Sequence, residues 1–232
     1  LLGDPALKLA YPRYNVVTSA VNDSLISESI QTLKALQEVK MSGYLEDDLG
    51  NKLTGFNGFI YPVVYDKQST VYTLNNDYDG TLGSVQDFKS FNKIIFKGKA
   101  SVTNGEFNFQ FVVPYDINYV VDNARVSYYS VSGNLDGHGD CNQFRIGGSL
   151  SGAELNRVGP EINLYLNDTL FISGGLSDTK PILIGRLKDE NGINTVGNGI
   201  GHDLIAIIDN NTQQPIILNE FYETDLDKYN SG

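Results

Sequence analysis

The sequence is poor in cysteine and in positive charge, and it contains no long apolar run. Its one cysteine, Cys141, rules out an intramolecular disulfide and a cysteine-rich zinc cluster. Acidic side chains number 28 against 17 basic ones, and the formal net charge is −11. A nucleic-acid partner is therefore not expected, because phosphates need a basic patch. No apolar run approaches the ~20 residues of a membrane-spanning helix, so we predict no transmembrane segment.

The residues that are abundant favour an all-β protein. The 232 residues include 24 Gly, 14 Tyr and 11 Phe, a composition typical of strands joined by tight turns. Apolar residues make up 41% of the chain, which is enough for a core. The length is ample for two domains.

The clearest element is a β-hairpin over 94–113. Asn104-Gly105 is a strong two-residue turn signal, and apolar residues alternate with polar ones on both sides of it. The turn sets a register that puts Phe107, Phe109 and Phe111 on one buried face. The predicted pairs are Val102–Phe107, Ala100–Phe109, Gly98–Phe111 and Phe96–Val113.

Other segments carry shorter patterns. The spacing of Ile26, Ile30, Leu33 and Leu36 predicts one short helix over 24–39. A strand is predicted over 59–65, and Pro62 within it favours an edge strand or a bulge. Further predicted strands are 125–131, 143–146, 162–166, 182–187 and 200–208, the last buried on both faces in its C-terminal half.

Together these patterns predict two β-sandwich domains. The first, over 25–150, is expected to be immunoglobulin-like, and the second covers 155–232. The small, polar segment 147–157 marks the boundary between them. Residues 1–24 are a lead-in that packs against the first domain.

Several segments resemble the PorU-like surface peptidases of type IX secretion, which are gingipain-type cysteine peptidases. The segment LLGDPALKLAYP at 1–12 resembles the end of the gingipain-type catalytic domain. The other matching segments are LKAL at 33–36, GKASVTNGEFNFQFVVPYDI at 98–117, VGPEINLYLND at 158–168, KDENGINTVGNGIGHDLIAIID at 188–209 and LNEFYE at 218–223.

The resemblance implies that the chain is the β-rich region that follows a peptidase domain. Members of the family are surface signal peptidases of sortase type, which process secreted cargo and attach it to the cell surface. Their catalytic His and Cys lie upstream of the matching segments, so we expect no catalytic residue here. The resemblance also implies an exported location, an upstream peptidase domain in cis, secretion components or cargo as partners, and an incomplete second domain.

The candidate sites each have a plainer interpretation. His138 and Cys141 suggest a nucleophile pair, but a glycine-rich loop is a poor place to hold one, and we predict a simple turn. Asn75, Asp77 and Asp79 are candidate calcium ligands, although such loops are more often solvated turns. The loop 225–230 is a poorer calcium candidate because Tyr229 occupies a ligand position. His202 is expected to be structural, with no cofactor.

A free-standing adhesion or carbohydrate-binding module, calcium-dependent or not, is the alternative function. Sugar binding would require an exposed aromatic cluster on one sheet. Tyr128 and Tyr129 are adjacent on a predicted strand and so point to opposite faces. They do not by themselves form such a cluster.

Overall fold

The computed structural model describes residues 11–74, 85–152, 158–194 and 203–232, and within these ranges the chain is built from strands. The first fourteen are β1 (Tyr14–Val21), β2 (Ser24–Leu25), β3 (Gln31–Ala35), β4 (Glu38–Glu46), β5 (Gly58–Tyr65), β6 (Ser69–Tyr72), β7 (Asp87–Ser90), β8 (Ile94–Lys97), β9 (Ala100–Thr103), β10 (Glu106–Val112), β11 (Asp122–Asn123), β12 (Arg125–Ser132), β13 (Leu135–Cys141) and β14 (Phe144–Ser149). The remainder are β15 (Glu161–Leu166), β16 (Leu183–Lys188), β17 (Ile205–Ala206), β18 (Ile216–Ile217) and a 3-10 helix (Asn219–Phe221).

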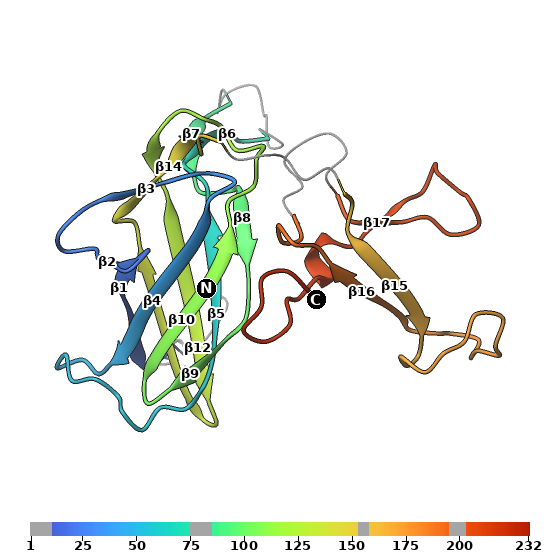
Figure 1. Cartoon of the computed structure of the whole chain (residues 1–232), viewed down its shortest axis with the longest axis horizontal. Helices are drawn as coiled ribbons and strands as arrows, with labels where there is room; N and C mark the ends of the chain where they lie inside the picture. Colours follow the sequence, from blue (N-terminus) through green and yellow to red (C-terminus); the bar gives the residue numbers. More distant parts are fainter. Residues whose placement is uncertain (1–10, 75–84, 153–157, 195–202) are drawn as a thin grey trace, which may run out of the picture.

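The main sheet closes on itself. Among the described residues, seven strands form a ring in the order β5-β12-β13-β1-β4-β10-β9, and β9 pairs with β5 to complete it. Most neighbours are antiparallel, whereas β1 and β13 are parallel. The all-β prediction is therefore confirmed, but the first domain is a barrel and not an immunoglobulin-like sandwich (Figure 1).

The barrel core is largely aromatic. Phe107, Phe109 and Phe111 are buried on the inner face of β10. The Phe96 ring stacks on those of Phe109 and Phe111, with centroids 5.9 and 5.0 Å apart. Tyr128 approaches the same group from β12. Burying each ring contributes roughly 1.5–3 kcal/mol, so this cluster is a major part of the barrel's stability.

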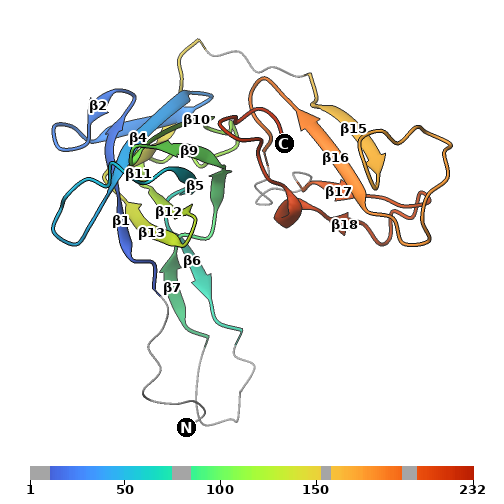
Figure 2. The same cartoon turned by 90° about the horizontal axis from the view of Figure 1, so that it is seen from below.

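A small sheet of β11, β14 and β3 packs on this core through Leu33, Phe144 and Ile146. The β6–β7 ladder extends away from the barrel, as Figure 2 shows. Neither region contains the predicted helix over 24–39. Leu33 and Ala35 are instead buried residues of β3, and Leu36 turns the chain into β4 with φ of 65°.

The predicted hairpin is confirmed at its turn but not along its length. Asn104 and Gly105 have φ of 52° and 74°, and Val102 lies opposite Phe107 as predicted. Beyond that pair β9 leaves β10 and pairs with β5. The predicted pairs Ala100–Phe109, Gly98–Phe111 and Phe96–Val113 do not form, because the main chains of β8 and β9 follow β5 and Phe96 contacts β10 only through its ring.

Pro62 does not lie on an edge strand. β5 pairs with β12 along its whole length on one side. On the other side it pairs with β9 and then β8, and Pro62 lies where those two strands are interrupted. There its carbonyl accepts from the Gly98 N–H at 3.0 Å, so the missing N–H of proline costs no strand pairing.

The lead-in predicted for 1–24 is not separate from the first domain. β1 is a barrel strand between β4 and β13, and its residues Val16 and Val21 belong to the core. Residues 1–10 lie outside the described part of the chain. The boundary predicted at 147–157 remains a prediction.

The predicted second sandwich does not form among the described residues after 157. They contain two ladders of two strands each, β15–β16 and β17–β18. Of the strand predicted over 200–208, residues 200–202 lie outside the described part of the chain, and within 203–208 the strand covers Ile205–Ala206, where Ile205 is 49% exposed instead of buried. No helix in the described ranges is long and apolar enough to cross a membrane.

Replacement of a core ring tests the role of the aromatic cluster. We expect Phe111→Ala to lower the free energy of unfolding by about 3–5 kcal/mol, because the cavity forms in a closed barrel. Asn108→Ala, on the exposed face of the same strand, should change it by less than about 0.5 kcal/mol. Urea denaturation measures both, and equal effects would show that the cluster is not the core.

Candidate functional site

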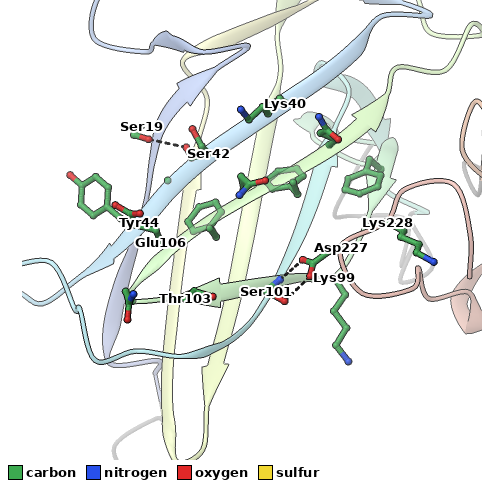
Figure 3. A pocket seen from close by; sticks show the side chains of 17 residues that line it. Ser19, Lys40, Ser42, Tyr44, Lys99, Ser101, Thr103, Glu106, Asp227 and Lys228 are labelled. Carbon is green, nitrogen blue, oxygen red and sulfur yellow. Dashed lines mark hydrogen bonds between the residues drawn. The ribbon is translucent and has the colours of Figure 1, made fainter.

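A wedge-shaped groove opens where β9 and β10 separate. Its cavity measures about 710 Å³, and its narrow end is the Asn104-Gly105 turn. Polar side chains of β4 and β10, such as Lys40 and Gln110, line one side, while the Phe96 and Phe109 rings lie at its base. Figure 3 shows Ser101 and Asp227 meeting on the opposite side. We call this groove the wedge.

The C-terminal residues 222–232, here the strap, take the place of β10 beside β9. The Lys99 N–H donates to Thr224 Oγ1 at 3.0 Å, and the Lys99 carbonyl accepts from the Asp227 N–H at 3.0 Å. The Asp227 carboxylate accepts from the Ser101 N–H at 2.6 Å and from the Ser101 hydroxyl at 2.7 Å. The strap thus satisfies the main chain at Lys99 and Ser101, where the pairing of β9 with β10 has ended.

The same strap also joins the β15–β16 ladder to the barrel. Gly232 exchanges main-chain hydrogen bonds with Leu187 of β16, at 2.8 and 3.1 Å. Tyr229 packs against the barrel core. Burial and the nearby charge of Glu38 raise the pKa of the Tyr229 hydroxyl. A smaller cavity of about 320 Å³ lies beside Tyr229, between the end of β10 and the loop 189–194.

Sequence reasoning missed the strap because it treated 225–230 as a possible ligand loop. Its two carboxylates instead serve as hydrogen-bond acceptors. Asp225 accepts from the Ser231 hydroxyl at 2.8 Å, and Asp227 accepts from Ser101. Asp225, Asp227 and the Asn-Ser-Gly run at 230–232 were a usable signal for a hydrogen-bonded turn, but the partner of this turn, Ser101 on β9, lies far away in the sequence.

Two buried tyrosines differ in their hydroxyl partners. Inside the barrel, Tyr128 and Thr18 share a hydrogen bond of 2.8 Å, and burial raises the pKa of Tyr128 far above its usual range. In the strap, the Tyr222 hydroxyl is buried with no hydrogen-bond partner among the described residues. Burial, and then the charge of Asp225, raises the pKa of Tyr222 to about 12.

His138 and Cys141 do not form a site together. The predicted turn around them is wrong, because both lie on strand β13. Three positions apart on a strand they point to opposite faces, and accordingly His138 is exposed and Cys141 is buried in the core. Gly139 between them is required by packing, since a Cβ there would lie 2.1 Å from the Val16 carbonyl oxygen on β1.

The other predicted site residues cannot be placed. Asn75, Asp77 and Asp79 lie outside the described residues, as does His202. The calcium site therefore remains a prediction. Within the described ranges, no group of three or more His, Cys, Asp or Glu side chains is arranged to hold a metal ion.

An aromatic cluster does lie on the outer face of the barrel. Tyr61 of β5 and Tyr129 of β12 stack with ring centroids 6.3 Å apart, and Tyr129 is 44% exposed. The Lys99 ammonium lies 4.8 Å from the Phe59 ring centroid and 5.6 Å from that of Tyr61. The sequence did not reveal this cluster because its members come from different strands.

Comparison with known proteins identifies a solved structure with a similar fold. No protein-family model matches the sequence, and no curated protein matches it. The fold is similar to dimeric latent PorU from Porphyromonas gingivalis, with a TM-score of 0.62 and 25% identity. That match covers 99% of this chain but 22% of PorU, so the chain spans about a fifth of that protein.

A second structure, the sporulation control protein Spo0M from Bacillus subtilis, matches with a TM-score of 0.34 and 12% identity. It covers 77% of this chain and 67% of Spo0M. The PorU match supports the resemblance noted in the sequence, and the described chain is a PorU-like region.

Loss of the Asp227 carboxylate tests whether the strap holds β9. We expect Asp227→Ala to lower the free energy of unfolding by about 1 kcal/mol, since two charge-assisted hydrogen bonds are lost at an exposed position. The Lys99 and Ser101 amides should exchange faster by NMR. Lys228→Ala is the neighbouring control and should change neither quantity; unchanged exchange in Asp227→Ala would contradict the assignment.

The two tyrosines provide a matched pair. Tyr128→Phe should lower the free energy of unfolding by about 1 kcal/mol, whereas Tyr222→Phe should leave it equal or higher because no hydrogen bond is lost. The pKa of tyrosine is about 10 in the unfolded state, and the pKa of Tyr222 in the folded state is about 12. Titration of Tyr222 therefore leaves the free energy of unfolding unchanged below about pH 10 and lowers it as the pH rises from about 10 to about 12. Urea denaturation at pH 8 and pH 11 should show this extra decline in wild type and not in Tyr222→Phe.

Proposed function

We propose that this chain is a non-catalytic accessory region of a PorU-like, gingipain-type cysteine peptidase of the type IX secretion system. The parent enzyme would be exported to the cell surface, where it processes secreted cargo and attaches it. One observation carries the proposal: the fold match extends over 99% of this chain while covering 22% of PorU. The chain thus corresponds to a part of a larger protein of that kind.

The chemistry of the described residues supports a structural role. Cys141, the one thiol of the chain, is buried in the core. The exposed His138 lies on the opposite face of the sheet. A nucleophile and its base need to be within hydrogen-bonding reach, and this pair is not.

The β15–β16 ladder supports a role in bracing another domain. Its apolar side chains are largely uncovered: Ile162 is 56% exposed and Leu164 is 63% exposed. An isolated ladder of two strands is marginally stable in water, and exposed apolar patches mark interaction sites. We assign this face to contact with the peptidase domain in cis, with cargo or secretion components as further partners.

Binding to a separately produced PorU peptidase domain tests the proposal. We expect the chain to bind it and raise its Tm. Leu164→Glu should weaken binding at least about tenfold, because a charge would enter an apolar interface. Asn163→Glu places the same charge on the opposite face of β15 and should bind like wild type. Isothermal titration calorimetry measures both affinities.

Three results would contradict this proposal. The first is a failure to bind the peptidase domain, and the second is equal binding by the two variants. The third is peptide or ester hydrolysis by the chain alone that is lost in Cys141→Ala.

A carbohydrate-binding adhesin is the second candidate, and the exposed cluster of Phe59, Tyr61 and Tyr129 favours it. Sugar rings stack on open aromatic faces. Here the Lys99 ammonium already lies over Phe59 and Tyr61, which makes these rings less available. Binding on a glycan array that is lost in Tyr129→Ala would favour the adhesin over the accessory region.

A further inference from the structure

The main chain of β10 has two different edges. The Leu45 N–H donates to the Gly105 carbonyl at 2.8 Å, which fixes the hydrogen-bonding phase of the β4–β10 ladder. In that phase the N–H and C=O groups of Phe109 and Phe111 point toward β4. Those of Gln110 point the other way, into the wedge.

Gln110 has no strand partner on the wedge side. The β9–β10 ladder stops at Phe107–Val102, and Lys99, which precedes β9 and would lie opposite Gln110 if the ladder continued, is bonded to the strap. No described residue bonds to the Gln110 main chain on this edge. Main-chain donors and acceptors at an open strand edge are a template for pairing with another extended segment.

We propose that the wedge binds a short extended peptide, which adds to β10 as a strand and pairs with Gln110. The strap already supplies hydrogen-bond acceptors to the β9 side through the Thr224 hydroxyl and the Asp227 carboxylate, so the β10 side is the edge left for an added strand. The cavity of about 710 Å³ lies within the usual ~300–1,000 Å³ range of binding pockets. Main-chain hydrogen bonds would supply affinity, and alternate side chains would supply selectivity.

The two sides of the wedge indicate the side chains that the peptide should carry. Residues facing inward would meet the Phe96 and Phe109 rings, so small apolar side chains fit there. Residues facing outward would lie near Asn108 and Lys40 on the polar face of the sheet. The expected ligand therefore alternates apolar and polar residues.

Charge selects acidic residues for the polar positions. The wedge is lined by Lys40, Lys99 and Lys228, with Glu106 and Asp227 as its acids. Glu106 pairs with Lys52 and Lys40 pairs with Asp23, while the hydrogen bonds of Asp227 to Ser101 bring no positive charge. The lining therefore holds three lysines against two acids, a positive balance on a chain whose net charge is −11. This balance favours an acidic, extended peptide.

This inference goes beyond the proposed function and does not depend on the identity of the parent protein. The wedge is separate from the β15 face that we assign to the peptidase domain. Peptide binding by the wedge and contact of the β15 face with the peptidase domain are measured with different probes and different variants. A negative result for one therefore does not contradict the other.

Amide exchange of the wild-type protein tests the open edge without any mutation. We expect the Gln110 amide hydrogen to exchange at least about a hundredfold faster than those of Phe109 and Phe111, which bond to β4. Similar protection at all three positions would overturn the proposal. Addition of peptide should slow the exchange of Gln110 in particular.

Binding is measured by NMR titration with the peptide acetyl-Glu-Val-Glu-Val-Glu-amide. The matching Lys-Val peptide should bind at least about tenfold more weakly and the difference should shrink in high salt. A Glu-Val peptide with N-methylated main-chain amides keeps its side chains but cannot pair as a strand. It should also lose about tenfold or more in affinity. Equal binding by the N-methylated peptide would overturn strand addition.

A proline at position 110 removes the N–H that the proposal requires. Gln110→Pro should abolish peptide binding, while Gln110→Ala, which loses the side chain but keeps the N–H, should bind like wild type. Residual protection of Phe109 and Phe111 verifies that the proline variant keeps its β4 ladder. Undiminished binding by a folded Gln110→Pro protein would overturn the proposal.

Discussion

The packing of Phe96 against Phe109 and Phe111 of β10 is the interaction on which the rest of this structure depends. Its ring stacks 5.0 Å from that of Phe111, so β8 contacts β10 through this side chain while its main chain pairs with β5. The hairpin opens beyond Val102, where β9 continues its pairing with β5. The strap crosses the gap between β9 and β10, and the wedge lies in this gap beside Gln110. The aromatic core thus spans the seam between β9 and β10, where the ladder has only two residue pairs.

Local patterns in the sequence predicted the elements that local chemistry determines. The Asn104-Gly105 turn and the buried phenylalanine face follow from neighbouring residues, as does the strand over 125–131. Closure into a barrel could not be predicted in this way, because it depends on pairings such as β1 with β13 and β5 with β12. The wedge could not be predicted for the same reason: Phe96 and Phe109 form its base and the strap forms its far side, and these residues are distant in the sequence.

The errors have identifiable physical causes. Gly137 and Gly139 suggested a turn, yet they lie on β13, where glycine lets the strand approach β1 closely. The helical spacing over 24–39 arose because two short strands and their turns happened to place apolar residues three or four apart. The predicted second sandwich assumed that apolar alternation implies a buried face, whereas Ile162 and Leu164 are exposed.

The parallel pairing of β1 with β13 also has a consequence for the order of folding. During synthesis β1 can pair with β4 early, since the two are close in sequence, but its other edge must wait for Gly137 and His138. Contacts so distant in sequence form slowly, and an open strand edge is prone to intermolecular pairing in the meantime. The unpaired edge of β1 is therefore a site at which a partly synthesised chain can associate with other chains until β13 has emerged.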